Sequence, residues 1–511
     1  MTREQILMLI SIIVYLLMIL YIGIRFSKKN NTVDDFYLGG RRLGPLVTAM
    51  SAEASDMSSW LLMGLPGLAY LSGICDAGWT AIGLAIGTYV NWLFVAKRLR
   101  YYSQRCGNAI TIPDFFSNRY RDNKKILLGI SALIIVIFFI PYTGSGFAAC
   151  GKLFSSLFDI DYHLAMIISA LIIIAYTCLG GFLAASTTDL IQSIIMTIAL
   201  IIVLGFGINV AGGLDAVIEN AKSLPGYLSM NSLYDPTTGK ETSYGMLKIA
   251  SMMAWGLGYF GMPHILLRFM AIEDRKKIKT SRRIASIWVV ISLAIAVFIG
   301  VIGLAMTNAG AIGTLKDSQA ETIIVKISSL LSTYGVIPAL IAGVILAGIM
   351  ASTMSTSDSQ LLAASSSVSQ NILPKVFKIN ITEKASMIVA RITLVIIAII
   401  GVIIAWDPNS SVFGIVSFAW AGFGATFGPV MLFALFWKRS NKYGAIAGMI
   451  VGGVMVFVWK YVIATFGGIW SIYELLPAFI CASIAIIIVS LATKAPEKEI
   501  TDEFEEVAAM K

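Results

Sequence analysis

The chain has 511 residues, of which 57% are hydrophobic and 13% are charged, and its formal net charge is +9. Soluble domains usually carry about 25% charged residues, so this composition excludes an ordinary soluble enzyme or binding domain and indicates an integral membrane protein. The positive charge does not point to a nucleic-acid partner, because the basic residues lie in short loops between apolar spans, as the positive-inside rule predicts.

Apolar segments of membrane length follow one another along the chain. A transmembrane helix needs about 20 apolar residues, and on that rule we expect an all-α protein with about thirteen membrane helices. Their cores are expected at 6–24, 46–73, 78–95, 126–158, 163–180, 190–210, 245–268, 284–305, 337–368, 385–405, 412–437, 444–462 and 475–491. The first is too long for the apolar region of a signal peptide. Those that begin at 46, 126 and 337 exceed one straight span, so we expect tilts or breaks there.

Basic residues gather in the loops that follow the first, third, seventh, ninth and eleventh spans. This alternation predicts a multi-pass protein of a bacterial-type cytoplasmic membrane, with the N-terminus outside and the C-terminus inside. Arg41 and Arg391, near inner helix ends, either shape a cytoplasmic gate or anchor at lipid headgroups. The charged tail at 494–511 is predicted to be a mobile cytoplasmic end.

The second span contains a polar insertion, and we expect its helix to be interrupted at 51–59. Residues 51–67 read SAEASDMSSWLLMGLPG and carry Glu53 and Asp56 within an otherwise apolar segment. An ionisable group at the centre of a bilayer costs roughly 2.5–3.5 kcal/mol even on the mildest scale. These carboxylates must therefore face protein, water or a bound ion, which predicts a site for a polar solute.

The seventh span is interrupted as well, by the glycine-rich string AWGLGYFGMP at 254–263. It lies five spans after the first interruption, and transporters built from inverted five-helix repeats place broken helices in such corresponding positions around a central site. Close packing of glycines in a membrane bundle would explain one such segment. Two at repeat spacing, one of them with carboxylates, favour a binding site.

The ninth span carries a polar stripe. Ser352, Ser355, Thr356 and Ser359 recur at helical spacing, and Asp358 lies among them. About half of such hydroxyls would bond back to their own helix. Bonding back to the helix does not explain Asp358, a second ionisable group in a membrane span. Hydroxyl and carbonyl oxygens are suitable ligands for an alkali cation, so we expect a sodium ion at this stripe.

Four strings carry a family resemblance: ASDMSSWLLMGLPG at 54–67, TDLIQ at 188–192, WGLGYFGMPHIL at 255–266 and MSTSDSQLL at 354–362. They resemble the sodium/solute symporter family over nearly the whole chain, and the first and third resemble its proline branch. The resemblance implies a LeuT-type five-helix inverted repeat with one extra N-terminal and two extra C-terminal helices. The implied divisions are 1–45 (first helix and cytoplasmic loop), 46–210 (first repeat), 211–243 (extracellular loop), 244–437 (second repeat), 438–493 (two helices) and 494–511 (tail).

The resemblance also implies site residues. Sodium would be bound by the carbonyls of Ala54, Met57 and Ser352 and by the hydroxyls of Ser355 and Thr356. Asp56 would support sodium coupling, with Ser58 beside it, and whether Asp56 touches the ion or holds the backbone stays open. The substrate would be bound by Trp60, Tyr142, Trp255, Tyr259 and Pro263. A second cation site could be built from Asp189, Ser355, Asp358 and Ser359, or Asp358 could carry a proton.

The chain departs from the family pattern at a few of these positions. Ser59 stands where glycine is common and Met262 where glutamine is common, which bears on substrate selectivity. Glu53 replaces a small residue, and Asp358 stands where a small or hydroxyl residue is common.

The function implied is sodium-coupled uptake of L-proline by alternating access. Na⁺ would be the coupling ion, and no other cofactor is expected. The partners would be L-proline, Na⁺ and membrane lipid, with no obligate protein partner. The main alternative is symport of another small solute: pantothenate, sialic acid, a sugar or a monocarboxylate. A channel would need a continuous polar pore, which Trp60, Trp255 and Tyr259 would obstruct. Enzymatic activity is not expected, because the sequence shows no nucleophile–base pair, and its histidines and cysteines lack metal-ligand spacing.

Overall fold

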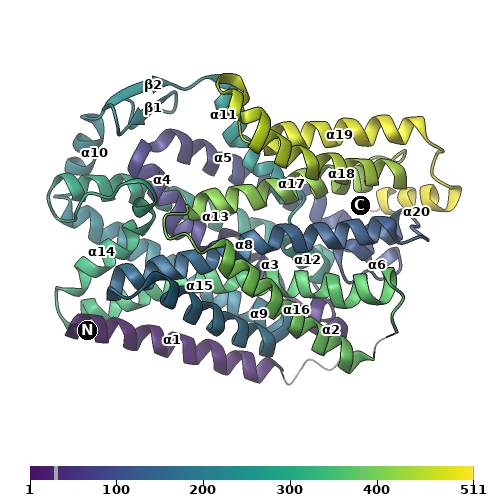
Figure 1. Cartoon of the computed structure of the whole chain (residues 1–511), viewed down its shortest axis with the longest axis horizontal. Helices are drawn as coiled ribbons and strands as arrows, with labels where there is room; N and C mark the ends of the chain where they lie inside the picture. Colours follow the sequence, from purple (N-terminus) through teal and green to yellow (C-terminus); the bar gives the residue numbers. More distant parts are fainter. Residues whose placement is uncertain (28–32, 381, 510–511) are drawn as a thin grey trace.

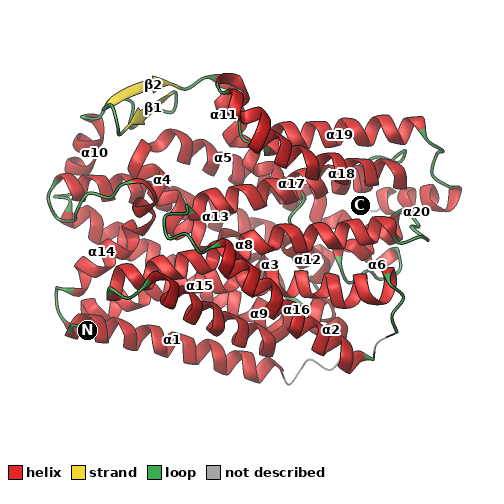
Figure 2. Cartoon of the chain, viewed as in Figure 1, coloured by secondary structure: helices red, strands yellow, loops and turns green. Residues whose placement is uncertain are grey.

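The computed structural model describes residues 1–27, 33–380 and 382–509, most of which are helical (Figures 1 and 2). Residues 28–32 of the predicted first cytoplasmic loop and residues 510–511 of the predicted tail lie outside the described residues. Within the described ranges, ten helices are long and apolar enough to cross a membrane, so the chain is a multi-pass membrane protein. The N-terminus of α1 (Arg3–Ser27) and the C-terminal helix α20 (Lys498–Ala509) lie toward opposite ends of the bundle.

Three of the thirteen predicted spans are not among these ten helices. The second and seventh are broken into shorter pieces, and the fifth is the shorter apolar helix Tyr162–Cys178. The total of thirteen crossings therefore stays a prediction, whereas the expectation of breaks in the second and seventh spans is confirmed.

The first broken span consists of α3 (Pro45–Ser59), the π-helical turn η2 (Trp60–Gly64) and α4 (Leu65–Ser72). The helix continues through most of the predicted interruption at 51–59 and breaks at Ser58, which has φ 46° and ψ −170°. Positive φ is rare for a residue with a side chain, and such strain clusters at binding sites.

The second broken span consists of α11 (Met246–Met253), the 3-10 segment η4 (Ala254–Phe260) and α12 (Pro263–Ala271), which matches the predicted interruption. Helix α5 (Ile74–Val90) packs against η4 backbone to backbone. A Cβ at Gly87 would overlap the backbone of Gly256, so only glycine allows this approach.

Helix α15 (Val336–Ser366) lies at the centre of the bundle, where it packs against α1, α3, α8 (Ile126–Phe158) and α9 (Tyr162–Val210). The spans predicted at 163–180 and 190–210 form the single assigned helix α9, which breaks at Gly181 with φ 65°. A π-helical segment, η7 (Ser367–Val376), continues α15.

The other elements complete the bundle and its ends (Figure 1). They are α2 (Val33–Leu38), η1 (Gly39–Arg41), η3 (Asn91–Val95), α6 (Ala96–Arg105), α7 (Ile112–Arg119), α10 (Leu214–Lys222), β1 (Ser232–Asp235), β2 (Lys240–Ser243), η5 (Arg275–Lys277), α13 (Ile278–Asn308), η6 (Asp317–Thr322), α14 (Ile323–Ser332), α16 (Glu383–Ile404), α17 (Val412–Phe436), α18 (Lys442–Val458), η8 (Trp459–Ile463), η9 (Ala464–Phe466), η10 (Gly468–Trp470) and α19 (Leu475–Ala492). The antiparallel hairpin β1–β2 and α10 occupy the long loop predicted at 211–243. Helices α17, α18 and α19 pack together at one side.

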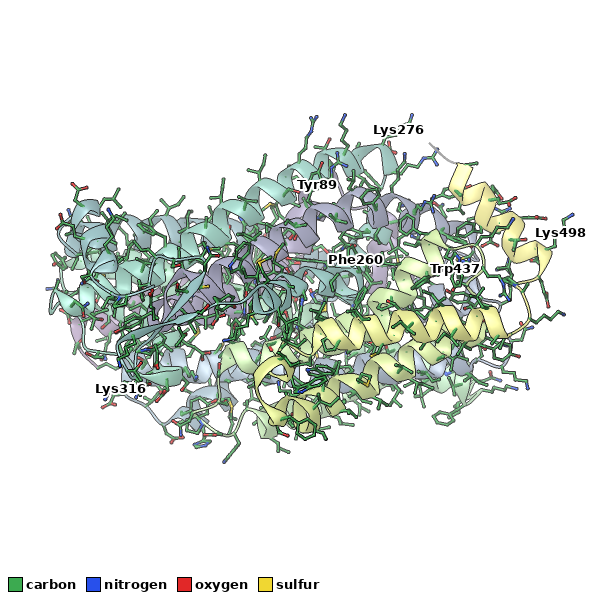
Figure 3. The ribbon with its side chains drawn as sticks, turned by 90° about the horizontal axis from the view of Figure 1, so that it is seen from above. Tyr89, Phe260, Lys276, Lys316, Trp437 and Lys498 are labelled. Carbon is green, nitrogen blue, oxygen red and sulfur yellow. The ribbon has the colours of Figure 1, made fainter. Side chains whose placement is uncertain are left out.

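The prediction of a mobile tail at 494–511 is wrong for most of that segment. Helix α20 is amphipathic and buries Phe504 and Val507, while Glu506 forms a 3.0 Å ion pair with Arg105 of α6. The sequence prediction counted the charges and overlooked the apolar stripe between them. Figure 3 shows Lys498 and Lys276 toward one end of the molecule and Lys316 toward the other, which agrees with the predicted sides of those loops.

Candidate functional site

The two broken helices meet at their breaks. The hydroxyl of Tyr259, in η4, donates a 2.6 Å hydrogen bond to Oδ2 of Asp56 in α3. The hydroxyl of Tyr142, in α8, donates to the backbone carbonyl of Asp56 at 3.3 Å. At the break itself, the backbone N–H of Trp60 donates to Oγ of Ser58 at 3.1 Å. The structure therefore brings together five predicted site residues, Tyr142 among them, around one unwound turn.

A narrow cavity of about 10 Å³, roughly the space of one water molecule, lies between these breaks. Its walls include the predicted residues Asp56, Met57, Trp60, Tyr142 and Trp255, and also Leu84, Val416 and Trp420. Tyr259 does not line the cavity and acts on it through Asp56, whereas Pro263 begins α12 and lies outside the lining. The cavity is thus mainly aromatic and apolar, with one carboxylate.

Stacked rings form one wall of the cavity. Trp60 and Trp255 lie 5.6 Å apart between ring centroids, and Phe413 packs on both at 6.2 and 5.2 Å. The indole N–H of Trp420 donates to the carbonyl of Trp255 at 2.7 Å, which fixes the η4 backbone. Sequence reasoning missed Phe413 and Trp420, because α17 is an unbroken apolar helix in which aromatic residues usually serve packing.

Phe413 is held in place by a buried carboxylate. Glu321, in η6, accepts hydrogen bonds from the backbone N–H groups of Val412 and Phe413 at 3.1 and 3.0 Å, at the N-terminus of α17. It also forms a 2.8 Å ion pair with Lys152 of α8. An anion at a helix N-terminus is favourable, so Glu321 positions the ring that covers Trp60 and Trp255.

Two buried donors at the first helix break have no partner among the described residues. They are the indole N–H of Trp60 and the hydroxyl of Ser59. A buried donor without an acceptor costs about 1–3 kcal/mol. An anionic group of a bound solute could accept hydrogen bonds from these two donors. The Asp56 carboxylate, which lines the cavity, could meet a cationic group of the same solute.

Oxygens of four of the five residues predicted to bind sodium lie close together between α3 and α15. The hydroxyl of Ser355 lies 2.8 Å from the carbonyl of Ala54 and 3.1 Å from that of Ser352, and the hydroxyl of Thr356 donates to Ser352 at 3.1 Å. All four residues are buried. The carbonyl of Met57, one turn along α3, accepts the backbone N–H of Trp60. In transporters with discontinuous helices, backbone carbonyls at the unwound turns coordinate the coupling cation.

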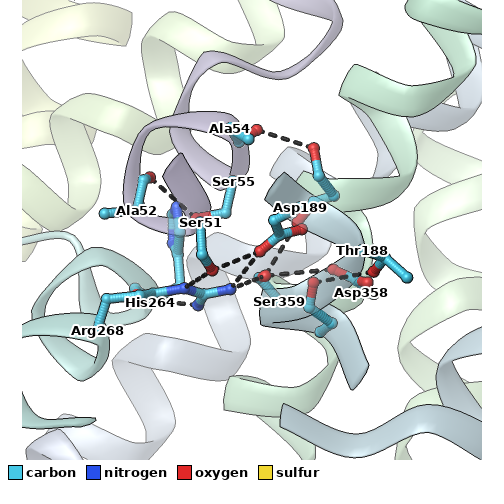
Figure 4. A network of polar contacts seen from close by, with 12 residues as sticks. Ser51, Ala52, Ala54, Ser55, Thr188, Asp189, His264, Arg268, Asp358 and Ser359 are labelled. Atoms are coloured by element: carbon cyan, nitrogen blue, oxygen red, sulfur yellow. Dashed lines mark hydrogen bonds and ion pairs between the residues drawn. The ribbon is translucent and has the colours of Figure 1, made fainter. Parts of the chain in front are cut away.

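A second polar cluster is joined to Ser355 through Ser359 (Figure 4). The guanidinium of Arg268, from α12, forms a 3.1 Å ion pair with Asp189 of α9 and donates to Ser359 at 2.5 Å and to Ser51 at 3.0 Å. The hydroxyl of Ser51 donates to Asp189 at 2.6 Å. The predicted residues Asp189 and Ser359 are therefore joined by a basic side chain that sequence reasoning did not assign to the site.

Asp358 completes this cluster. Its Oδ1 lies 3.2 Å from Oγ of Ser359, which in turn lies 2.9 Å from the carbonyl of Ser355. Oδ2 of Asp358 and Oδ1 of Asp189 are buried, and neither has a hydrogen-bond partner within the described part of the chain. Two carboxylates and one guanidinium leave a net charge of −1, which one more cation or proton would neutralise.

The Arg41 side chain lies beside the end of α12, outside the lining of the cavity. Its guanidinium donates to the carbonyls of Met270 and Ala109 at 2.7 and 2.8 Å, which links η1 to the end of α12 and to the loop before α7. Whether Arg41 shapes a cytoplasmic gate or anchors at lipid headgroups stays a prediction.

The chain is similar to known proteins over nearly its whole length. A model of the sodium:solute symporter family matches residues 36–452. The chain is 43% identical to a sodium/proline symporter of Haemophilus influenzae, over 97% of both chains, and 42% identical to a high-affinity proline transporter of Bacillus subtilis, over 95% of this chain and 98% of that one. A solved structure of a Na⁺-coupled sialic acid symporter in an outward-open state superposes with a TM-score of 0.79 at 19% identity, covering 96% of this chain and 99% of that chain. That likeness shows the fold.

Proposed function

The chain belongs to the sodium:solute symporter family, and we propose that it is a sodium/proline symporter that takes up L-proline by alternating access. The fold is the LeuT-type arrangement of its structural neighbours. The observation that carries the choice of substrate is the small aromatic cavity between the two helix breaks, supported by the names of the full-length relatives.

The cavity has the chemistry that a proline zwitterion needs. The rings of Trp60, Trp255 and Tyr142 offer flat apolar walls for the pyrrolidine ring and a face for its ammonium group. The unpartnered indole N–H of Trp60 and hydroxyl of Ser59 would donate to the carboxylate. Tyr259 and Pro263 would contribute indirectly, through Asp56 and through the start of α12.

Sodium would bind beside this cavity at the oxygens of Ala54, Met57, Ser352, Ser355 and Thr356. Ser355 already bridges α3 and α15, so an ion there would hold the first break against the central helix. Asp56 and Ser58 lie on the same turn and would transmit the effect to the substrate walls, because Asp56 binds Tyr259. This arrangement couples the two ligands, and proline must then raise the affinity for sodium by the factor by which sodium raises the affinity for proline.

A second cation would bind near Asp189, Asp358 and Ser359. Arg268 supplies one fixed positive charge there, and the remaining charge of −1 leaves room for a sodium ion or a proton on Asp358. Because Ser359 reaches the carbonyl of Ser355, this second cation would be linked to the first sodium site.

The protein would work in the cytoplasmic membrane of a bacterium, with the N-terminus outside and the C-terminus inside. Each sodium ion that enters then contributes about 2.3 kcal/mol per 100 mV of membrane potential, enough for more than tenfold accumulation of proline. The two five-helix repeats would be 46–210 and 244–437, flanked by α1 and by two helices in 438–493, and they would move relative to each other around the fixed site.

Uptake of labelled L-proline by the purified full-length protein in proteoliposomes tests this function. A sodium gradient should drive accumulation, and matched lithium or proton gradients should drive much less. Unlabelled pantothenate, sialic acid, glucose and pyruvate serve as competitors. Absence of sodium-stimulated proline uptake, together with uptake of one of those competitors, would assign the chain to the alternative solute.

A further inference from the structure

A basic cavity of about 450 Å³ lies at the surface of the bundle, between η3 and the first turns of α13. Of the eight described residues that line it, three are apolar or aromatic, five are basic and none is acidic. The first three are Trp92, Leu93 and Ile278, and the basic five are Lys97, Arg275, Lys276, Lys279 and Arg282. Pockets that take small ligands have volumes of about 300–1,000 Å³. The cavity thus has the size and the charge to hold an anionic group.

The charge of this cavity is not neutralised by acidic neighbours. Within the part of the chain that the structure describes, its three lysines and Arg282 form no ion pair. Glu273 pairs at 2.6 Å with Lys277, which does not line the cavity, and the carboxylate of Asp274 accepts the backbone N–H of Lys276 at 2.8 Å. The segment 273–283 holds six basic residues and two acidic ones, so its formal net charge is +4.

Arg282 adds a donor that lacks an acceptor. Its Nε is buried and has no hydrogen-bond partner among the described residues, and its guanidinium lies over the ring of Tyr89 on α5, 5.3 Å from the centroid. A buried donor on a charged group is costly to leave unpaired. The positive-inside rule explains why basic residues gather in such loops. It explains neither a cavity with this lining nor a buried guanidinium N–H without a partner, and both features indicate a bound anion.

Apolar side chains continue from the cavity along the two helices that border it, toward the middle of the bundle. Five of them are 38–62% exposed: Ile82, Ile86 and Tyr89 of α5, and Ile287 and Val290 of α13. The contact between Arg282 and Tyr89 places these two faces next to each other. Both helices belong to segments long and apolar enough to cross a membrane, so the exposed faces contact acyl chains there. A ligand with an anionic headgroup and apolar tails would match the whole surface.

We propose that this cavity binds the headgroup of an anionic phospholipid, with its phosphate against Arg282 and the lysines and its acyl chains along α5 and α13. Basic pockets between membrane helices hold such headgroups, and each Lys or Arg near a membrane surface strengthens the attraction by roughly a factor of five. A soluble anion would meet the same charges and leave the apolar faces unmatched. The site is separate from the central cavity, so it requires neither sodium nor proline.

The inner wall of the lipid cavity is tied to both broken spans. Trp92 donates a 2.8 Å hydrogen bond to Oε1 of Glu53 in α3, and its ring lies 4.5 Å from that of Phe269 in α12. The side-chain amide of the preceding residue, Asn91, donates to the carbonyl of Tyr259 in η4 at 3.0 Å. A lipid that holds η3 against α13 would therefore brace the elements around the central cavity, and it should raise the temperature at which the protein unfolds.

Native mass spectrometry of the purified full-length protein, released from detergent micelles that contain phosphatidylglycerol or phosphatidylcholine, tests this inference without sodium or proline. Wild-type protein should retain one phosphatidylglycerol molecule more tightly than phosphatidylcholine, and phosphatidylglycerol should raise its unfolding temperature. A triple variant should bind phosphatidylglycerol at least about tenfold more weakly and lose most of the thermal shift. Its substitutions are Lys276→Gln, Lys279→Gln and Arg282→Gln.

A second triple variant removes the same amount of charge from exposed positions that do not line the cavity, and it should behave like wild type. Its substitutions are Lys124→Gln, Lys378→Gln and Lys384→Gln. Lys279→Gln alone changes one exposed side chain, covers a first triple variant that does not fold, and should weaken binding about fivefold.

Three results would overturn the inference. They are equal weakening in the two triple variants, equal retention of the two lipids by wild-type protein, and unchanged binding in Lys279→Gln. Displacement of phosphatidylglycerol by an equal concentration of inorganic phosphate would overturn a lipid occupant in favour of a soluble anion.

Discussion

Tyr259 and Asp56 join the two broken helices, since the tyrosine hydroxyl donates a 2.6 Å hydrogen bond to the carboxylate at the centre of the bundle. Neither side chain is exposed, and Asp56 lines the cavity while Tyr259 lies behind it. The contact gives a direct route by which an ion held at the first break can affect the aromatic wall carried by the second.

Tyr259→Phe removes this bond and leaves the ring in place. A hydrogen bond to a charged group contributes about 1.5–3 kcal/mol, so we expect the apparent affinity for proline to fall about tenfold or more at fixed sodium. The proline concentration for half-maximal uptake in proteoliposomes, at fixed sodium, measures this apparent affinity. Tyr162→Phe makes the same chemical change far from the cavity, where the hydroxyl donates to the carbonyl of Ala405, and should leave the affinity unchanged. Equal effects of the two substitutions would contradict a coupling role for Tyr259.

Ser355→Ala removes a hydroxyl that joins α3 to α15 at the proposed sodium oxygens. We expect the sodium concentration for half-maximal uptake to rise about tenfold or more, because an ion ligand and the bridging hydrogen bond are both lost. Proline affinity measured at saturating sodium should change much less. Ser365→Ala, on the same helix, removes a hydroxyl that donates to the carbonyl of Leu362, outside the proposed sodium oxygens, and is the control. An unchanged sodium dependence would exclude Ser355 as a ligand.

Glu321→Gln breaks the buried ion pair with Lys152 and weakens the support of Phe413. Loss of one partner from a buried pair typically costs about 3–5 kcal/mol, so the variant should unfold at a lower temperature and release bound proline faster. Thermal unfolding and proline dissociation rates measure the two effects. Adding Lys152→Met should restore much of the stability, since no unpaired charge then remains, but should not restore slow dissociation if Phe413 acts as a lid.

Asp358→Asn tests the second cation. If a sodium ion or a proton binds at Asp358, its removal should lower the number of cations moved per proline by one, measured from the sodium gradient at which net proline flux reverses at known pH and potential. An unchanged ratio would rule out a transported cation at this residue and leave Asp358 as a partner of Ser359.

Two variants of α20 separate the contributions to its docking. Glu506 and Arg105 are about half exposed, and exposed ion pairs contribute about 0–1 kcal/mol, so Glu506→Gln should change little. Phe504→Ala removes a buried ring over which Arg119 lies at 5.4 Å and should release the helix. Hydrogen exchange of the α20 backbone measures the effect of each variant on docking.

The ion pair of α20 also predicts a pH dependence. Arg105 lowers the pKa of Glu506 below its usual value of 4.5, so the ionic part of docking should persist at neutral pH and be lost only as the pH falls below that value.

The sequence was sufficient for the features that depend on local composition. Apolar length predicted most spans, and glycine and carboxylate interruptions predicted both breaks, because these signals are contiguous along the chain. It was insufficient for partners that come from distant segments. Nothing local indicates that Glu321 supports Phe413, that Arg268 lies between Asp189 and Ser359, or that Trp420 fixes the backbone of Trp255. The exact position of the first break, at Ser58, also depends on packing rather than on the serine run.

The measurement that tests sodium-coupled proline transport most directly is calorimetric titration of the purified full-length protein with proline at several sodium concentrations, and with sodium at several proline concentrations. We expect sodium to raise proline affinity and proline to raise sodium affinity by the same factor, with lithium or potassium giving a much smaller effect. Proline that binds equally well with and without sodium would contradict the coupling of the two broken helices on which the proposed function depends.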